Sequence, residues 1–225
     1  MDRLLEIVES IADTETTAYL LQQDFVIFGL AAIALLGLLS GAIGPFIIMR
    51  QMSFSVHGAS ELALTGAAAA LLFGLNLGLG AIVGSVIAAL MFGIMGSRAS
   101  QRDSSIGVVL AFGLGLAVLF IHLYPGRSGT SFSLLTGQIV GVSENGLVQM
   151  AVVAAIICVA LIALYRPLVF SSADPEVAAA RGVPVRALNM IFAVLVGLAA
   201  AQAVQVVGAL LVLSLIHISE PTRPL

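Results

Sequence analysis

The chain has 225 residues, of which 60% are hydrophobic and only 9% are charged, and its formal net charge is −3. A soluble domain usually carries about 25% charged residues. Together with a mean hydropathy of +1.14, this composition excludes an ordinary soluble protein and predicts a polytopic membrane protein. Nothing in the charge pattern indicates nucleic-acid binding. A phosphate-binding loop with its Lys is also excluded, because the chain has no Lys.

An acidic segment, residues 1–24, begins the chain, and we expect it to lie outside the membrane. Six continuously apolar runs follow. Each is long enough to cross a bilayer as a helix, which takes about 20 residues. Continuous rather than alternating apolar residues favour helices over a β-barrel. The sequence therefore predicts an all-α bundle of about six transmembrane helices within residues 25–212. The predicted spans are 25–49, 54–75, 77–96, 106–124, 146–164 and 187–212.

Arginine positions in the short loops predict the orientation of these spans. With the acidic segment outside, Arg3 and Arg127 fall on the outer side, and six other Arg residues fall on the opposite side. Cytoplasmic loops carry the excess of basic residues. We therefore expect a multi-pass protein of a bacterial-type plasma membrane, with the six-Arg side in the cytoplasm. These six are Arg50, Arg98, Arg102, Arg166, Arg181 and Arg186.

The second span contains His57 and Glu61, which lie one helical turn apart. Residues four apart share a helix face, and an imidazole beside a carboxylate can coordinate a divalent cation. Ionisable groups inside a membrane are costly and mark functional sites. We expect His57 and Glu61 to line a pathway and to bind a metal ion transiently. The alternative is that they pair with each other or with Arg50 and only stabilise the bundle.

The sixth apolar run is interrupted by Gln202 and Gln205. Amides in membrane helices usually form hydrogen bonds between helices, and lining of the pathway is the second interpretation. Small residues four apart also predict close helix contacts, at Gly37 with Gly41 and at Gly80 with Gly84.

A cytoplasmic loop, residues 165–187, is predicted between the fifth and sixth spans. Within it, Asp174 can cap a short helix that Pro175 opens and that has Glu176 in its first turn. Gly182, followed by Pro184, can end this helix. A short cytoplasmic helix between two spans is suited to docking a partner, although an ordinary solvated loop helix has similar residues.

Three segments resemble the metal-importing ABC transporter permeases, the integral subunits of zinc, manganese and iron importers. The segments are QMSFSVHGASELALTGAA at 51–68, DSSIGVVLAFGLGLAVLF at 103–120, and DPEVAAARGVPVRALNM at 174–190 followed by VVGALLV. The resemblance implies an import permease that forms a homodimer, with ATP hydrolysed by a separate cytoplasmic ABC ATPase. It also implies an extracytoplasmic metal-binding protein. The chain itself is expected to hold no cofactor, and the divalent cation is its cargo.

The same resemblance implies that the loop helix docks on the ATPase. The residues that we assign to this coupling on the family pattern are Asp174, Pro175, Glu176, Ala179 and Gly182.

The second-span motif departs from the family pattern, in which Asp is followed four positions later by His. Here the matching positions are His57 and Glu61, with Thr65 in place of the usual Pro and with Gly66 retained. The acid and the imidazole have exchanged order, but both donor types remain. A metal-facing role is therefore still expected, while the metal preference cannot be transferred, since His and carboxylate suit zinc, manganese and iron alike.

The end of the chain has a different character. Residues 213–223, LSLIHISEPTR, resemble the translation of a sequencing adapter. We expect residues 213–225 not to belong to the natural protein, and further spans to follow residue 212 in the family.

Two other classes of function remain open at this stage. A permease of the same architecture could import a metal chelate, siderophore or vitamin, and its wide apolar pathway would tolerate substitution of His57 and Glu61. An intramembrane metal-dependent enzyme could also use these residues, but a catalytic zinc needs three protein ligands. Apart from the adapter-like end, the only other His is His122, so the sequence offers few ligands for an enzyme.

Overall fold

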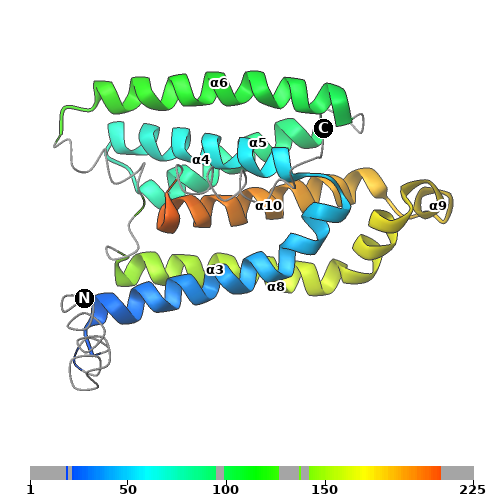
Figure 1. Ribbon diagram of the computed structural model, residues 1–225, viewed down its shortest axis with the longest axis horizontal. Coiled ribbons are helices and arrows are strands. Elements are labelled where there is room, and N and C mark those ends of the chain that lie inside the picture. Colours follow the sequence, from blue (N-terminus) through cyan, green and yellow to red (C-terminus); the bar gives the residue numbers. More distant parts are fainter. Residues whose placement is uncertain (1–18, 20–21, 95–98, 127–136, 138–141, 209–225) are drawn as a thin grey trace, which may run out of the picture.

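The computed structural model describes residues 19, 22–94, 99–126, 137 and 142–208. Within these ranges the chain is helical and contains no strand, which confirms the predicted all-α class (Figure 1). The acidic segment up to residue 18, Arg98, Arg127 and the adapter-like end lie outside the described residues. The helices are α3 (Asp24–Met49), α4 (Ser53–Leu72), α5 (Leu77–Ile94), α6 (Ala99–Leu123), α8 (Glu144–Ala173), α9 (Pro175–Ala180) and α10 (Val185–Val207).

The long helices form two groups that share α10 (Figure 1). On one side α4 packs against α5 and α6, and on the other side α3 packs against α8. Because α10 contacts α3, α4, α5 and α8, it joins the two groups into one bundle. Successive long helices run in opposite directions, so the α3–α4 turn and the short helix α9 lie at the same end of the molecule (Figure 1).

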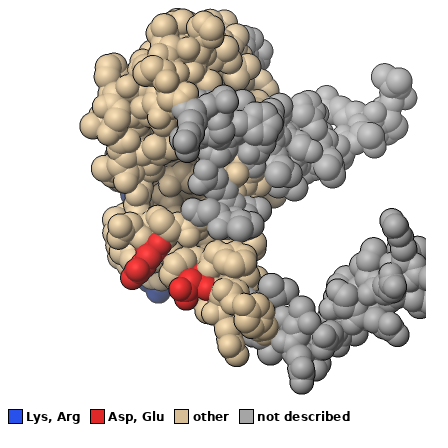
Figure 2. Space-filling model, turned by 90° about the vertical axis from the view of Figure 1, so that its left-hand side faces the viewer, with Lys and Arg blue, Asp and Glu red and all other residues tan. Residues whose placement is uncertain are grey.

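The charges differ between the two ends of the bundle. Arg50 ends α3, and Arg181 and Arg186 lie at the end of α9 and the start of α10. At the opposite end, Asp24 and Glu144 begin α3 and α8. Figure 2 looks onto this opposite end, where acidic side chains stand out on the described surface. Among the described residues, basic side chains thus lie at the α9 end, which the sequence analysis expects to face the cytoplasm.

Four helical segments are long and apolar enough to cross a membrane: α3, residues 106–123 of α6, α8 and α10. The apolar part of α5, Leu77–Phe92, is shorter. Helix α4 does not reach this hydropathy, because it carries His57, Glu61, Thr65 and three Ser residues. It is instead largely buried between α5, α6 and α10. A helix that faces other helices rather than lipid does not need a continuously apolar surface.

The predicted spans correspond to the long helices, but two boundaries differ clearly. Helix α6 begins at Ala99, seven residues before the predicted start of the fourth span. Helix α8 continues to Ala173, past the predicted end of the fifth span at Leu164, and it contains Pro167. Proline is tolerated in a membrane helix when neighbouring groups satisfy the backbone that it leaves unbonded. Much of the predicted loop 165–187 is therefore helical, and only a few residues on each side of α9 are not.

Glycine permits the closest helix contact in the described structure, between α4 and α5. A Cβ atom at Gly66 would lie 2.1 Å from the carbonyl oxygen of Gly80, and a Cβ at Gly84 would lie 2.1 Å from that of Leu62. No side chain fits at these distances, so the predicted contact at Gly80 and Gly84 is confirmed. The parallel contact expected at Gly37 and Gly41 is not found within the described residues, where no atom lies within 4 Å of a Cβ at either position.

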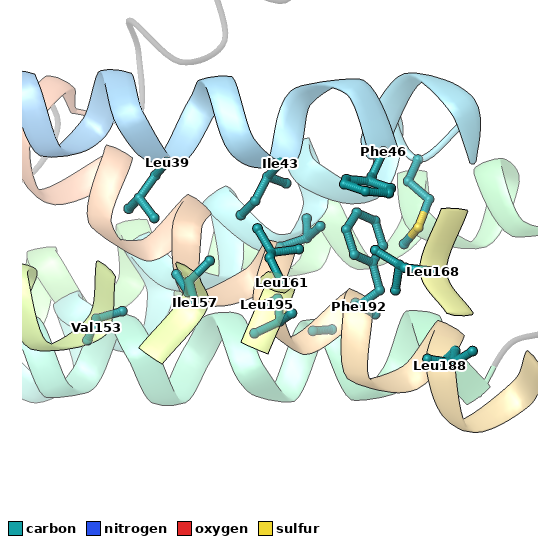
Figure 3. Close-up of a cluster of buried hydrophobic side chains, with 14 of the residues drawn as sticks. Leu39, Ile43, Phe46, Val153, Ile157, Leu161, Leu168, Leu188, Phe192 and Leu195 are labelled. Carbon is teal, nitrogen blue, oxygen red and sulfur yellow. The ribbon is translucent and has the colours of Figure 1, made fainter. Parts of the chain in front are cut away.

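The largest apolar core lies where α3, α8 and α10 meet (Figure 3). Leu39, Ile43 and Phe46 of α3 face Ile157 and Leu161 of α8, with residues of α10 beside them. The Phe46 ring packs edge-on against Phe192 of α10, with the ring centroids 6.0 Å apart. These contacts place the ends of the three helices nearest α9 next to each other.

Candidate functional site

The ionisable face of α4 lies inside the bundle. Glu61 is only 8% exposed, and its Oε2 atom has no hydrogen-bond partner within the described residues. His57, one turn earlier, is half-buried, and its ring packs edge-on against Phe54 with centroids 6.4 Å apart. Taking a carboxylate out of water is costly unless it is paired or binds a cation. The α4 face therefore offers an imidazole and a carboxylate oxygen that is available to a ligand.

Hydroxyl groups hold this part of α4 in place. Thr65 donates to the carbonyl oxygen of Gly113 on α6 at 2.8 Å, and it also lies 3.0 Å from the carbonyl oxygen of Glu61. Ser60 donates to the carbonyl oxygen of His57 at 2.7 Å. The bond from Thr65 to Gly113 ties α4 to α6 one turn beyond Glu61. Sequence reasoning noted Thr65 only as a departure from the family proline and missed this contact.

The structure also bears on the alternative in which Arg50 pairs with the α4 face. The Arg50 guanidinium donates to Ser172, Ser171, Asn189 and the carbonyl oxygen of Leu168. Among the described residues, no hydrogen bond or ion pair joins it to Glu61. The described residues also contain no group of three or more His, Cys, Asp or Glu side chains that could hold a metal ion. His57 and Glu61 thus supply two donor groups from one chain.

The two glutamines of α10 have different surroundings. Gln202 is fully buried, and neither its amide nitrogen nor its amide oxygen has a hydrogen-bond partner in the described part of the chain. The interhelical hydrogen bond expected for Gln202 is therefore not found there. Gln205 lines a cavity of about 320 Å³ near the outer end, together with Gln149 of α8 and Asn76. Within the described residues, no hydrogen bond joins either glutamine to His57 or Glu61.

The short helix α9 has the capping that its sequence predicts. The Asp174 carboxylate accepts hydrogen bonds from the backbone N–H groups of Glu176 at 3.1 Å and Val177 at 3.0 Å. Pro175 opens the helix, and Gly182 follows it with a φ of +83°. This left-handed conformation favours glycine. The residues assigned to ATPase coupling, including Ala179, are exposed, so the helix presents a surface at the end of the bundle that also holds the α3–α4 turn.

Comparisons with known proteins agree with these features. The profile of the ABC 3 transport family matches residues 22–221. The chain is 30% identical over 198 residues to the manganese transport system membrane protein MntC of Halalkalibacterium halodurans, covering 88% of this chain and 68% of that protein. It is also 30% identical over 205 residues to the manganese import system permease protein ScaB of Streptococcus parasanguinis, covering 90% of this chain and 72% of the relative.

A solved structure has the same fold. The structure of PsaBC from Streptococcus pneumoniae in complex with Fab superposes with a TM-score of 0.76 at 27% sequence identity. The superposition covers 95% of this chain and 74% of that one. The resemblance drawn from three sequence segments is therefore confirmed. Because the family profile spans every helix from α3 to α10, the chain belongs to the ABC 3 transport family and is a multi-pass membrane permease.

Proposed function

We propose that this permease imports free divalent metal ions, with manganese as its main cargo, and that His57 and Glu61 bind the ion in transit. The observation that carries the proposal is the buried Glu61 carboxylate, whose Oε2 has no hydrogen-bond partner within the described residues and which shares a helix face with His57. Relatives named as manganese transport proteins support the choice of metal.

The number of donors suits transport better than permanent binding. A transport site must capture the ion and then release it, so a closed cage of ligands would hold the ion for too long. His57 and Glu61 provide two donor groups, and a second permease across a dimer axis would double them. Water can complete the coordination of manganese, which accepts carboxylate, imidazole and water ligands.

The energy for import is proposed to come from a separate subunit. A cytoplasmic ABC ATPase would bind the exposed surface of α9, and its cycle of ATP binding and hydrolysis would move the helices between outward-open and inward-open states. An extracytoplasmic metal-binding protein would deliver the ion to the opposite end. The permease itself is a transport subunit and not the enzyme of this system.

Uptake of radioactive manganese tests this proposal. The permease would be expressed from its complete gene, with its ATPase and binding protein, in bacteria that lack their own manganese importers. The double variant His57→Ala/Glu61→Ala should reduce uptake to background, with its amount in the membrane unchanged. The matched control is His122→Ala/Glu144→Ala, which removes an exposed His and an exposed Glu and should leave uptake intact.

Intact uptake in the His57→Ala/Glu61→Ala variant would contradict the proposed site. The same cells also distinguish the cargo. If they accumulate metal only as a complex with an organic chelator, and the double variant has a mild effect, the permease imports a chelate instead of the free ion.

A further inference from the structure

The connection between α3 and α4 is short and tightly folded. Helix α3 ends at Met49, α4 begins at Ser53, and Gln51 between them has a φ of +51°. The N–H of Met52 donates to the carbonyl oxygen of Ile47 at 3.0 Å, and the Met52 side chain is buried. Hydrogen bonds close this turn and a buried side chain holds it in the core, so the turn is rigid. When a rigid turn moves, the helix attached to it moves as well. Movement of this turn should therefore move the start of α4.

One side chain connects this turn to two other helices. The Arg50 guanidinium donates to Ser172 Oγ and Ser171 Oγ, both at 2.7 Å, in the last turn of α8. It also donates to Asn189 Oδ1 of α10 and lies 5.1 Å from the centre of the Phe192 ring. The contacts on α8 come just before α9 in the chain, and the contacts on α10 come just after it. Arg50 therefore contacts the two helices, α8 and α10, that precede and follow α9 in the chain.

The hydrogen bonds of Arg50 are of a kind that can rearrange when the helices move. Arg presents several N–H donors in a rigid planar fork, which a Lys ammonium cannot reproduce. Burial lowers the pKa of Arg50 below its usual value, although a guanidinium stays charged in proteins. Its partners in the described structure are hydroxyl, amide and carbonyl groups, with no carboxylate. Neutral partners are more easily exchanged for water than a buried carboxylate. The contacts of Arg50 with α8 and α10 can therefore shift without breaking an ion pair.

We infer that Arg50 is a positioning residue that couples movement of α9 to movement of α4 and of its His57–Glu61 face. The inference rests on the proposed function, because it presumes that a partner ATPase moves α9. Arg50 lies in the turn directly before α4, and His57 is the fifth residue of that helix. A displacement of the α8 and α10 segments beside α9 is carried by the guanidinium to the α3–α4 turn, and α4 follows as a rigid helix.

Proteoliposomes that contain the permease from its complete gene and its ATPase test the inference, with the metal-loaded binding protein added outside. The readout is the manganese imported per ATP hydrolysed, because a loss of folded protein lowers both rates but leaves their ratio unchanged. Arg50→Met should lower this ratio by about tenfold, within the range typical of coupling between sites. Arg50→Lys should not restore it. The control Arg166→Met removes an exposed arginine near the same end and should keep the wild-type ratio.

A second variant keeps the inference testable if Arg50→Met folds poorly. Asn189→Leu removes only the hydrogen-bond partner on α10, at an exposed position, and should also lower the ratio. A ratio in these variants equal to that of Arg166→Met, in a system whose wild type imports manganese, overturns the inference and leaves the proposed function standing. A wild-type complex that hydrolyses ATP but imports no manganese overturns the proposed function, and the inference with it.

Discussion

At the scale of single residues, the carboxylate of Glu61 distinguishes α4 from an ordinary packing helix. An ionisable side chain buried inside a membrane helix bundle usually serves a function or is paired. Thr65 and Ser60 fix the backbone around it. The negative charge of Glu61 should therefore matter more for transport than for folding.

Glu61→Gln tests the role of this charge. The amide keeps the volume of the side chain but cannot match the attraction of a carboxylate for a divalent cation. We expect manganese uptake at low metal concentration to fall at least about tenfold, which corresponds to about 1.4 kcal/mol, with the amount of permease in the membrane unchanged. Glu144→Gln, at an exposed position at the start of α8, is the control. Equal uptake by the two variants would show that the Glu61 charge is not used.

At the scale of elements, two features of the helices carry the account: the cap of α9 and the close contact of α4 with α5. Helix α9 has only six residues, and a helix this short is not stable by itself. Its conformation depends on the Asp174 cap and on Ala178, which is fully buried. The α4–α5 contact depends on glycines that admit no side chain.

Asp174→Ala removes the cap of α9. The loss of an N-cap costs about 1 kcal/mol, so the backbone amides of Glu176 and Val177 should exchange with solvent about five times faster. Hydrogen–deuterium exchange of the permease in detergent measures this difference. Asp174→Asn, which keeps a capping oxygen, should restore most of the protection. Unchanged exchange in Asp174→Ala would mean that the carboxylate does not hold the helix.

Gly84→Leu tests the α4–α5 contact. A side chain at this position meets the carbonyl oxygen of Leu62, so the helices must separate, and overpacking of this kind costs about 1–3 kcal/mol. We expect a clearly lower Tm for the detergent-solubilised permease. Gly37→Leu, on α3, has space for its Cβ and should change the stability by less than about 0.5 kcal/mol. Similar Tm values for the two variants would refute the close contact.

At the scale of the whole molecule, the sequence predicted the helices better than their contacts. Apolar runs predicted the long helices, and the capping residues predicted α9. Both signals lie within short stretches of the chain. The Thr65–Gly113 bond joins positions 48 residues apart, and the Arg50–Asn189 bond joins positions 139 residues apart. No local pattern reports such contacts. The end of α8 differs from the predicted end of the fifth span because the continuous apolar run stops at Tyr165 and Arg166, while the helix continues to Ala173.

The whole-molecule account joins the His57–Glu61 face of α4, the short helix α9 that we propose binds the ATPase, and the bundle that connects them. Its central claim is that this permease carries divalent metal ions across the membrane along the face of His57 and Glu61. This claim concerns transport by the assembled system, so it requires an assay with two separated compartments.

The most direct test is ATP-driven manganese accumulation in proteoliposomes that contain the permease, its ATPase and its binding protein. The account predicts that manganese enters only when ATP is present, and that His57→Ala/Glu61→Ala abolishes entry although the variant still assembles with the ATPase. The account would be contradicted if the wild-type complex accumulated no manganese with ATP, or if the double variant accumulated as much as the wild type.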